Sequence, residues 1–276
     1  MSKEYDLIKS KNIKIGIVNQ KGGVGKTTLT QNLACSLNNE HNKKVLAIDL
    51  DPQSSLTTCL GYNSDDLENT ITKAIKKTIN GEEIDIREYI LKNKEGIYLI
   101  GSDILLTKIE RALAPETMRE FVLKRTLKGL EALNFDFILV DSPPFLSLIS
   151  DNILTFVDSV LIPISPEFLS YKAFSIIAGS LKEIKDKTNP DLETIGIIFN
   201  QVDLRTFHHK NIMEYSKKTL GENIYIFNSI IRTNTLIRES QLKGQSILTY
   251  DPSSNGAKDF KAFVNEFLKI TNLGGD

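Results

Sequence analysis

Short apolar runs rich in Ile, Leu and Val alternate along the chain with longer polar stretches. Runs of this length and composition are typical of strands buried on both faces of a parallel sheet. The runs are residues 13–18, 44–48, 97–100, 135–140, 158–165 and 194–200. Strands that alternate with helical stretches predict an α/β fold, here a doubly wound, mostly parallel sheet with helices on both faces.

Helices are expected between these strands and after the last of them. They cover residues 104–113, 117–133, about 166–187, and a tail from residue 256 that is apolar on one face. The polar stretch 61–95 is helix-prone as well. We expect a polar lead-in at 1–12, one domain at 13–272 and a short tail at 273–276. No apolar run approaches the roughly 18 residues that a transmembrane helix needs.

A glycine-rich turn follows the first strand and opens a helix. Its sequence, from Lys21 to Thr28, is KGGVGKTT. Backbone N–H groups of such a turn, with the helix N-terminus behind them, form a cradle for phosphate, and glycine permits the close approach. Lys26 is placed to reach the β- and γ-phosphates, and the Thr27 hydroxyl to hold Mg²⁺. The predicted cradle is Gly22, Gly23, Val24, Gly25, Lys26, Thr27 and Thr28.

Aspartates follow two of the predicted strands. Asp49 and Asp51 end the 44–48 strand, and their spacing of two directs both side chains the same way, toward the phosphates. Asp141 ends the strongest strand of the chain, 135–140, and is followed by Ser-Pro-Pro. A hydrophobic strand that ends in aspartate downstream of a phosphate loop is the Walker B arrangement. Asp141 is therefore expected to hold Mg²⁺.

The overall charge is nearly balanced, with 34 basic and 35 acidic residues. No global field attracts nucleic acid or membrane, so such a partner must meet a local patch. Residues 203–243 carry seven Lys or Arg against four Asp or Glu, a local excess of 7 − 4 = 3 positive charges. An excess of this size is typical both of a solvated helix face and of a phosphate-backbone site. Cys35 and Cys59 form no metal-binding motif, and without a secretory signal we expect a cytoplasmic protein with reduced thiols.

The loop KGGVGKTT departs from the standard pattern because Gln20 stands where the first glycine is usual, and Lys21 leads the loop. With DLDPQ at 49–53 and DSPP at 141–144, it resembles the deviant P-loop of the MinD/ParA group of ATPases. The resemblance implies that Lys21 crosses a dimer interface to the partner's nucleotide. It also implies that Asp51 positions the attacking water and that Asp49 orders the Mg²⁺ shell.

Further positions follow from the same resemblance. Asn200 ends a strand where the group binds adenine, and Asp251 with Pro252, in a YDP element, is implied to lie near that base. Glu167 is implied at the dimer face, although a glutamate that stabilises a helix start explains it equally well.

Asp203-Leu204-Arg205-Thr206 resembles the D-x-R-T turn of partition ATPases, whose arginine contributes to nonspecific DNA binding. The DNA-binding residues implied here are Arg205, Lys210, Arg232 and Arg238.

The function implied is an ATP-dependent DNA partition ATPase with ATP and Mg²⁺ as ligands. A nucleotide-sandwich homodimer is implied to bind duplex DNA nonspecifically and to associate with the nucleoid. Slow hydrolysis, stimulated by a centromere-binding, ParB-like partner, is implied to release the DNA.

Two alternatives remain. A membrane-cycling positioning ATPase of the MinD kind would use the 256–270 helix as an anchor, but acidic residues interrupt its basic flank, so we expect no membrane partner. A DNA-binding scaffold gated by ATP would show negligible turnover, which the presence of Asp51 disfavours.

Overall fold

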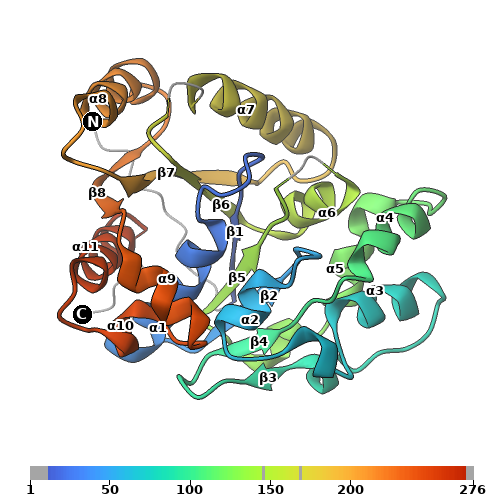
Figure 1. The fold of residues 1–276 in the computed structure, drawn as a ribbon. Helices are drawn as coiled ribbons and strands as arrows, with labels where there is room; N and C mark the ends of the chain where they lie inside the picture. Colours follow the sequence, from blue (N-terminus) through green and yellow to red (C-terminus); the bar gives the residue numbers. More distant parts are fainter. Residues whose placement is uncertain (1–11, 145–146, 168–169, 272–276) are drawn as a thin grey trace.

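One sheet of eight strands, in the order β3-β4-β2-β5-β1-β6-β7-β8, runs through the molecule. The computed structural model describes residues 12–144, 147–167 and 170–271 (Figure 1). The strands are β1 (Ile13–Ile17), β2 (Val45–Asp49), β3 (Leu91–Lys92), β4 (Tyr98–Ile100), β5 (Phe137–Asp141), β6 (Ser159–Ile164), β7 (Glu193–Val202) and β8 (Ile226–Arg232). All neighbours pair in parallel except β3 with β4. The predicted doubly wound, mostly parallel sheet is confirmed.

Helices cover both faces of this sheet (Figure 1). One apolar core lies under α3 (Ile71–Ile79), α4 (Leu106–Leu113), α5 (Val122–Thr126), α6 (Leu148–Phe156), α7 (Ser170–Lys187) and α8 (Phe207–Leu220). The other lies under α1 (Lys26–His41), α2 (Ser55–Cys59), α9 (Thr235–Leu242), α10 (Ile247–Tyr250) and α11 (Asn255–Ile270). The 3-10 helices are Ser64–Asp66, Ile86–Tyr89, Arg119–Phe121 and Leu130–Leu133.

The register of the central strands brings the predicted chemistry to one edge of the sheet. Ile17 on β1 pairs with Asp141 on β5, and Asp141 pairs in turn with Asp49 on β2. These pairs are the last residues of their strands, so two carboxylates and the start of the glycine loop meet at the carboxyl edge. In open α/β sheets this edge is where ligands bind.

Two expectations about secondary structure were wrong. Residues 117–133 do not form one helix, because Met118 and Gly129 adopt left-handed backbone conformations with φ of 51° and 96°. The segment is instead broken into two 3-10 helices and the short α5. The stretch 203–243 is not only a basic surface segment, because it contains β8, whose apolar residues complete the edge of the sheet.

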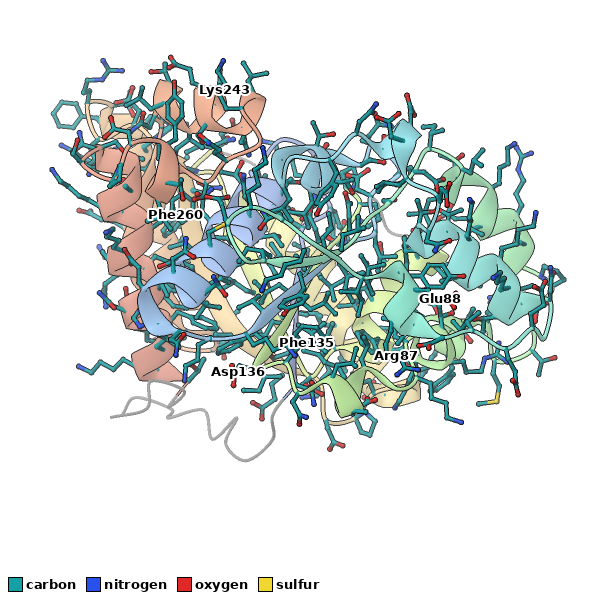
Figure 2. All side chains as sticks on the ribbon, turned by 90° about the horizontal axis from the view of Figure 1, so that it is seen from below. Arg87, Glu88, Phe135, Asp136, Lys243 and Phe260 are labelled. Atoms are coloured by element: carbon teal, nitrogen blue, oxygen red, sulfur yellow. The ribbon has the colours of Figure 1, made fainter. Side chains whose placement is uncertain are left out.

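The last helix, α11, is docked rather than free. Phe260, Phe263 and Phe267 are completely buried, and the ring centroid of Phe263 lies 5.0 Å from that of Phe227 on β8. Figure 2 shows Phe260 on the inner side of this helix. No helix in the described ranges combines the length and apolar character that a membrane span requires.

Phe263→Ala removes a buried ring and is expected to lower the free energy of unfolding by about 3–5 kcal/mol, because the surrounding core relaxes only partly into the cavity that is left. Phe207→Ala is the matched control: its ring is 81% exposed, so we expect a change within about 0.5 kcal/mol. Urea unfolding followed by circular dichroism measures both. Equal, small effects for the two variants would contradict a docked α11.

Candidate functional site

A pocket of about 440 Å³ opens above the carboxyl edge of the sheet. Its walls come from the glycine loop, the loop after β2, the end of β7, and the segment from β8 into α9. The lining residues are Gly22, Gly23, Gly25, Lys26, Thr27, Thr28, Asp51, Ser55, Cys59, Pro144, Asn200, Gln201, Arg232, Thr233, Asn234, Ile237, Arg238 and Gln241. Most of the predicted cradle therefore lies on one wall, and Val24 is buried behind it.

The glycine loop is held open by amide side chains at the end of β7. Asn200 donates from Nδ2 to the carbonyl of Val24 at 2.9 Å, and Gln201 donates from Nε2 to that of Gly23 at 2.8 Å. Gly25 has φ of 84°, and a Cβ there would lie 2.2 Å from Asn200 Nδ2, so no other residue fits. Asn200, which sequence resemblance assigned to adenine, is thus also a support of the phosphate loop.

Lys26 begins α1 with its side chain folded over the loop. The residue is 7% exposed, and Nζ lies 3.5 Å from the carbonyl oxygen of Lys21. Burial lowers the pKa of Lys26, while the carboxylates of Asp141 and Asp51 oppose that shift. The ammonium is thus partly desolvated and turned toward the pocket, as expected of a group that binds phosphate.

Lys21, the leading lysine of the loop, forms an ion pair with Glu167 of the same chain. Its side chain keeps 40% of its surface exposed. The Glu167 carboxyl has a lowered pKa, chiefly because of the hydrogen bond from Lys21. Both residues that resemblance assigned to a dimer interface therefore contact each other within one chain.

Thr27 and Asp141 meet at the centre of the site. The Thr27 hydroxyl donates to Asp141 Oδ2 at 2.6 Å, and the Thr30 hydroxyl lies 3.2 Å from Oδ1. Asp141 is completely buried, and its pKa is raised to about 8 by burial first and by Asp49 next, although Thr27 and Lys26 lower it. Burial outweighs the attraction of the Lys26 ammonium, so the neutral form of this carboxyl is favoured.

Asp49 and Asp51 occupy different positions. Asp49 is completely buried: Oδ2 accepts from the Thr57 N–H at 2.8 Å and from its hydroxyl at 2.7 Å, and Oδ1 accepts from the Asp51 N–H at 3.1 Å. Burial raises the pKa of Asp49 to about 6. Asp51 lines the pocket, with Oδ1 accepting from the Gln53 N–H at 2.9 Å. Asp49 therefore shapes the loop that carries Asp51 into the pocket.

These residues fit a magnesium-bound triphosphate. In the described part of the chain, no three His, Cys, Asp or Glu side chains gather as a metal site. Mg²⁺ does not need such a group of three side chains, because it is usually held by one or two protein oxygens together with phosphates and water. Thr27 and Asp141 supply those oxygens beside a cradle of glycine amides at the α1 N-terminus.

One face of α9 forms a wall of the pocket that sequence reasoning missed. Asn234, Ile237, Arg238 and Gln241 follow helical spacing, and Gln241 Nε2 donates to the Thr28 hydroxyl at 3.0 Å. The spacing was visible in the sequence, but which face it would meet was not. Arg238, assigned by resemblance to DNA, lies on this wall.

Asp251 and Pro252 do not line the pocket. The Asp251 carboxylate instead accepts from the N–H and the hydroxyl of Ser253, and these bonds lower its pKa. The structure therefore does not bring the YDP element to the lining of this pocket.

A second, open groove of about 810 Å³ adjoins the pocket. It contains Arg205 and Arg232, and the N-termini of α9 and α11 border it. The two cavities share Arg232, Thr233 and Asn234. Helix N-termini and arginines are both favourable surroundings for anions.

The two arginines of this groove differ in how exposed they are and in how firmly other side chains hold them. Arg205 pairs with Asp203, yet its side chain is 90% exposed, and the hydrogen bonds hold the pKa of Asp203 well below its usual range. Arg232 forms a two-pronged pair with Asp259 and so pins β8 to α11. Lys210 is exposed, with Nζ 5.9 Å from the centroid of the Phe207 ring.

Known proteins resemble this chain along most of its length. A family model described as an AAA domain matches residues 12–194, more than half of the 276. The sporulation initiation inhibitor protein Soj of Bacillus subtilis is 33% identical over 253 residues, 91% of this chain and 96% of that protein. The chromosome partitioning protein ParA of Myxococcus xanthus is 34% identical over 92% of this chain and 87% of its own length.

A solved structure has a similar fold along most of the chain. The cobyrinic acid a,c-diamide synthase of Mycobacterium smegmatis, with bound ADP and magnesium, superposes with a TM-score of 0.80 at 26% identity, covering 96% of this chain and 97% of that one. The glycine cradle, the Thr27–Asp141 contact and these similarities agree. The chain therefore belongs to the ParA/Soj family of P-loop ATPases.

Proposed function

We propose that this ATPase partitions DNA: with Mg-ATP it forms a sandwich dimer that binds duplex DNA nonspecifically, and hydrolysis, stimulated by a centromere-binding partner, releases the DNA. The observation that carries the proposal is the wall shared by the nucleotide pocket and the arginine groove, from Arg232 to Asn234. The relative from Myxococcus xanthus, named a chromosome partitioning protein, supports it.

At the nucleotide, Lys26 and the amides of the glycine loop bind the phosphates, while Thr27 and Asp141 hold the metal. Bound Mg²⁺ would neutralise phosphate charge and order the γ-phosphate for attack by water. Asp51 orients that water from the pocket wall, and Asp49 fixes the Asp51 loop. Ile237 offers an apolar surface for the base on the α9 side of the pocket. Asn200 supports the phosphate loop from β7.

Dimerisation requires the Lys21 side chain to leave Glu167 and to contact the nucleotide of the other subunit instead. In the single chain it is paired with Glu167, and the pair is largely exposed. Exposed ion pairs contribute little to stability, so the exchange costs little. Lys21 of each subunit then contacts the nucleotide of the other, and Glu167 lies at the rim of that interface.

DNA binding uses the groove beside the pocket. Arg205 and the N-termini of α9 and α11 face it, and Arg232 forms a fixed wall. Arg238 lies in the adjoining pocket, and Lys210 is exposed on α8. Each such groove offers few charges, and a dimer joins two of them on one duplex, which raises the effective affinity.

The membrane-cycling alternative is less well supported. It needs the apolar face of α11, and those side chains are buried against β8 and α1. The scaffold alternative requires that Asp51 has no catalytic role, which the next experiment tests.

Asp51→Asn keeps the shape of the loop, because the amide oxygen can still accept from the Gln53 N–H. We expect Mg-ATP binding near the wild-type level and hydrolysis slower by about 10²-fold, the lower end for loss of a catalytic carboxylate. Single-turnover hydrolysis and equilibrium binding of a labelled ATP separate the two effects. Asp65→Asn, on an exposed 3-10 helix, is the matched control. Unchanged hydrolysis in Asp51→Asn would favour the scaffold.

Asp141 is expected to make the stability of the metal-free protein depend on pH. Its pKa is about 8 in the folded chain and near its ordinary value when unfolded. A raised folded pKa gives a contribution that is full below the unfolded pKa and is lost as pH rises toward about 8. Asp141→Asn should flatten this decline, as urea unfolding across that range would measure. An identical slope in both proteins would contradict a neutral, buried Asp141.

DNA binding is expected only in the presence of ATP. It should weaken as the salt concentration rises, because binding releases counterions that are condensed on the DNA and this release is less favourable at high salt. Arg205→Ala should weaken binding for every sequence and lower the salt slope by about 1. Anisotropy of a labelled duplex with ATP, ADP or no nucleotide, at two salt concentrations, measures this.

Arg87→Ala is a close control, because Arg87 pairs with Asp85 as Arg205 does with Asp203, with the same spacing and high exposure. In Figure 2 Arg87 lies in the lower part of the molecule and Lys243, which follows α9, near the top, so the two are well separated in that view. Equal losses in the two variants would contradict a role for the groove. Absence of binding in all three nucleotide states would overturn the proposed function.

A further inference from the structure

A separate groove of about 480 Å³ runs along the outer surface of α5 and the 3-10 helix before it. It is lined by Thr117, Met118, Phe121, Lys124, Arg125 and Lys128. None of these residues lines the nucleotide pocket or the arginine groove. The groove therefore belongs to neither of the sites described above.

Its charge is one-sided. Lys124, Arg125 and Lys128 are exposed, and the lining contains no carboxylate. Within the described ranges, these three cations form no ion pair. Unlike Arg205 and Arg232, none of the three is in ion-pair contact with an aspartate of the described residues, although Lys124 acts from a greater distance on the carboxyl of Asp158. Such a cluster of like charges is unfavourable in isolation and favours an anionic ligand.

An apolar element lies beside these cations. Met118 is 63% exposed, and its φ of 51° is uncommon for a residue with a side chain of this size. Phe121, on the next turn, is half-buried. Both the exposure of this apolar side chain and its left-handed backbone conformation are unfavourable in free energy for the isolated chain. Residues in such conformations concentrate at binding sites.

The backbone under the groove is held firmly. Asn152 of α6, 3% exposed, accepts from the Leu123 N–H at 2.9 Å and donates to the Arg119 carbonyl at 2.9 Å. Val122 and Leu123 are buried in the core beneath. One buried amide thus ties together both segments that carry the lining side chains, so the groove exists before any ligand arrives.

We propose that this groove docks a short acidic segment of a partner protein, with one apolar side chain against Met118 and Phe121. Carboxylates of that segment pair with Lys124, Arg125 and Lys128, and the flexible thioether of Met118 adapts to the anchor. A nucleic-acid backbone would use the cations and leave the two apolar residues uncovered. A membrane surface would need a broader apolar face than two side chains provide.

The test uses a fluorescein-labelled, glutamate-rich peptide with one central phenylalanine, added to the full chain at physiological ionic strength. Anisotropy is expected to show saturable binding, and Lys124→Glu with Lys128→Glu to weaken it by about tenfold or more, since attraction becomes repulsion. Lys182→Glu with Lys185→Glu is the matched control. It makes the same charge change at exposed positions of α7 that form no ion pair with the described residues, and it is expected to bind the peptide within about twofold of wild type.

A second variant separates the apolar contact from charge. Met118→Gly suits the left-handed backbone and removes only the side chain, so the fold is retained. It is expected to bind the phenylalanine peptide as weakly as wild type binds a peptide with serine in place of that phenylalanine.

The proposal is overturned if the wild-type chain does not bind the peptide, or if both lysine pairs reduce binding equally. It is also overturned if Lys124→Glu with Lys128→Glu abolishes binding to duplex DNA or to phosphatidylserine vesicles while peptide binding persists. These results do not depend on the arginine groove, since Arg205→Ala leaves the α5 groove intact.

Discussion

The contact between Thr27 and Asp141 is the constraint on which the active centre depends. A carboxyl group is completely buried at the end of a central strand, and a hydroxyl from the phosphate loop is its nearest donor at 2.6 Å. Asp49 lies beside it on the next strand and adds a like charge. The protein holds the oxygens of Thr27 and Asp141 next to each other, and burial favours the neutral form of the carboxyl, so these two groups fit a site for a cation.

This arrangement requires a rigid frame, which the two helical layers provide. On one side, α11 is held by buried phenylalanines and by the Arg232–Asp259 pair, so β8 and the start of α9 cannot shift freely. Gln241 then joins α9 to Thr28 of the phosphate loop. Helix α9, which begins at the wall shared by the pocket and the arginine groove, is thus hydrogen-bonded to the phosphate loop.

The other layer carries a different surface. There the α5 groove is fixed through Asn152 to α6, the helix that follows the Ser-Pro-Pro turn after Asp141. Nucleotide chemistry and the arginine groove thus share one end of the molecule, whereas the basic, methionine-bearing groove lies on α5. Separate surfaces allow an ATPase to meet more than one partner without competition for a single site.

Several features were determined by the sequence alone because they depend on local physics. Glycines next to Lys26 and Thr27 can serve little but a phosphate loop, and apolar runs that end in aspartate specify parallel strands with carboxylates at one edge. These runs located six strands within two residues at each end. The Leu91–Lys92 strand cannot be predicted because two residues carry no pattern, and the apolar residues of β8 are not distinguishable from the basic segment that surrounds them.

Tertiary structure decided whatever depends on contacts between distant residues. Arg232 resembles a DNA contact in sequence, yet Asp259 lies against it and makes it a structural pin. The meeting of Gln241 with Thr28 joins residues 213 positions apart, and the bonds of Asn200 to the phosphate loop span 176. A helical period shows which residues share a face but not what that face meets, because the meeting depends on how the whole chain packs.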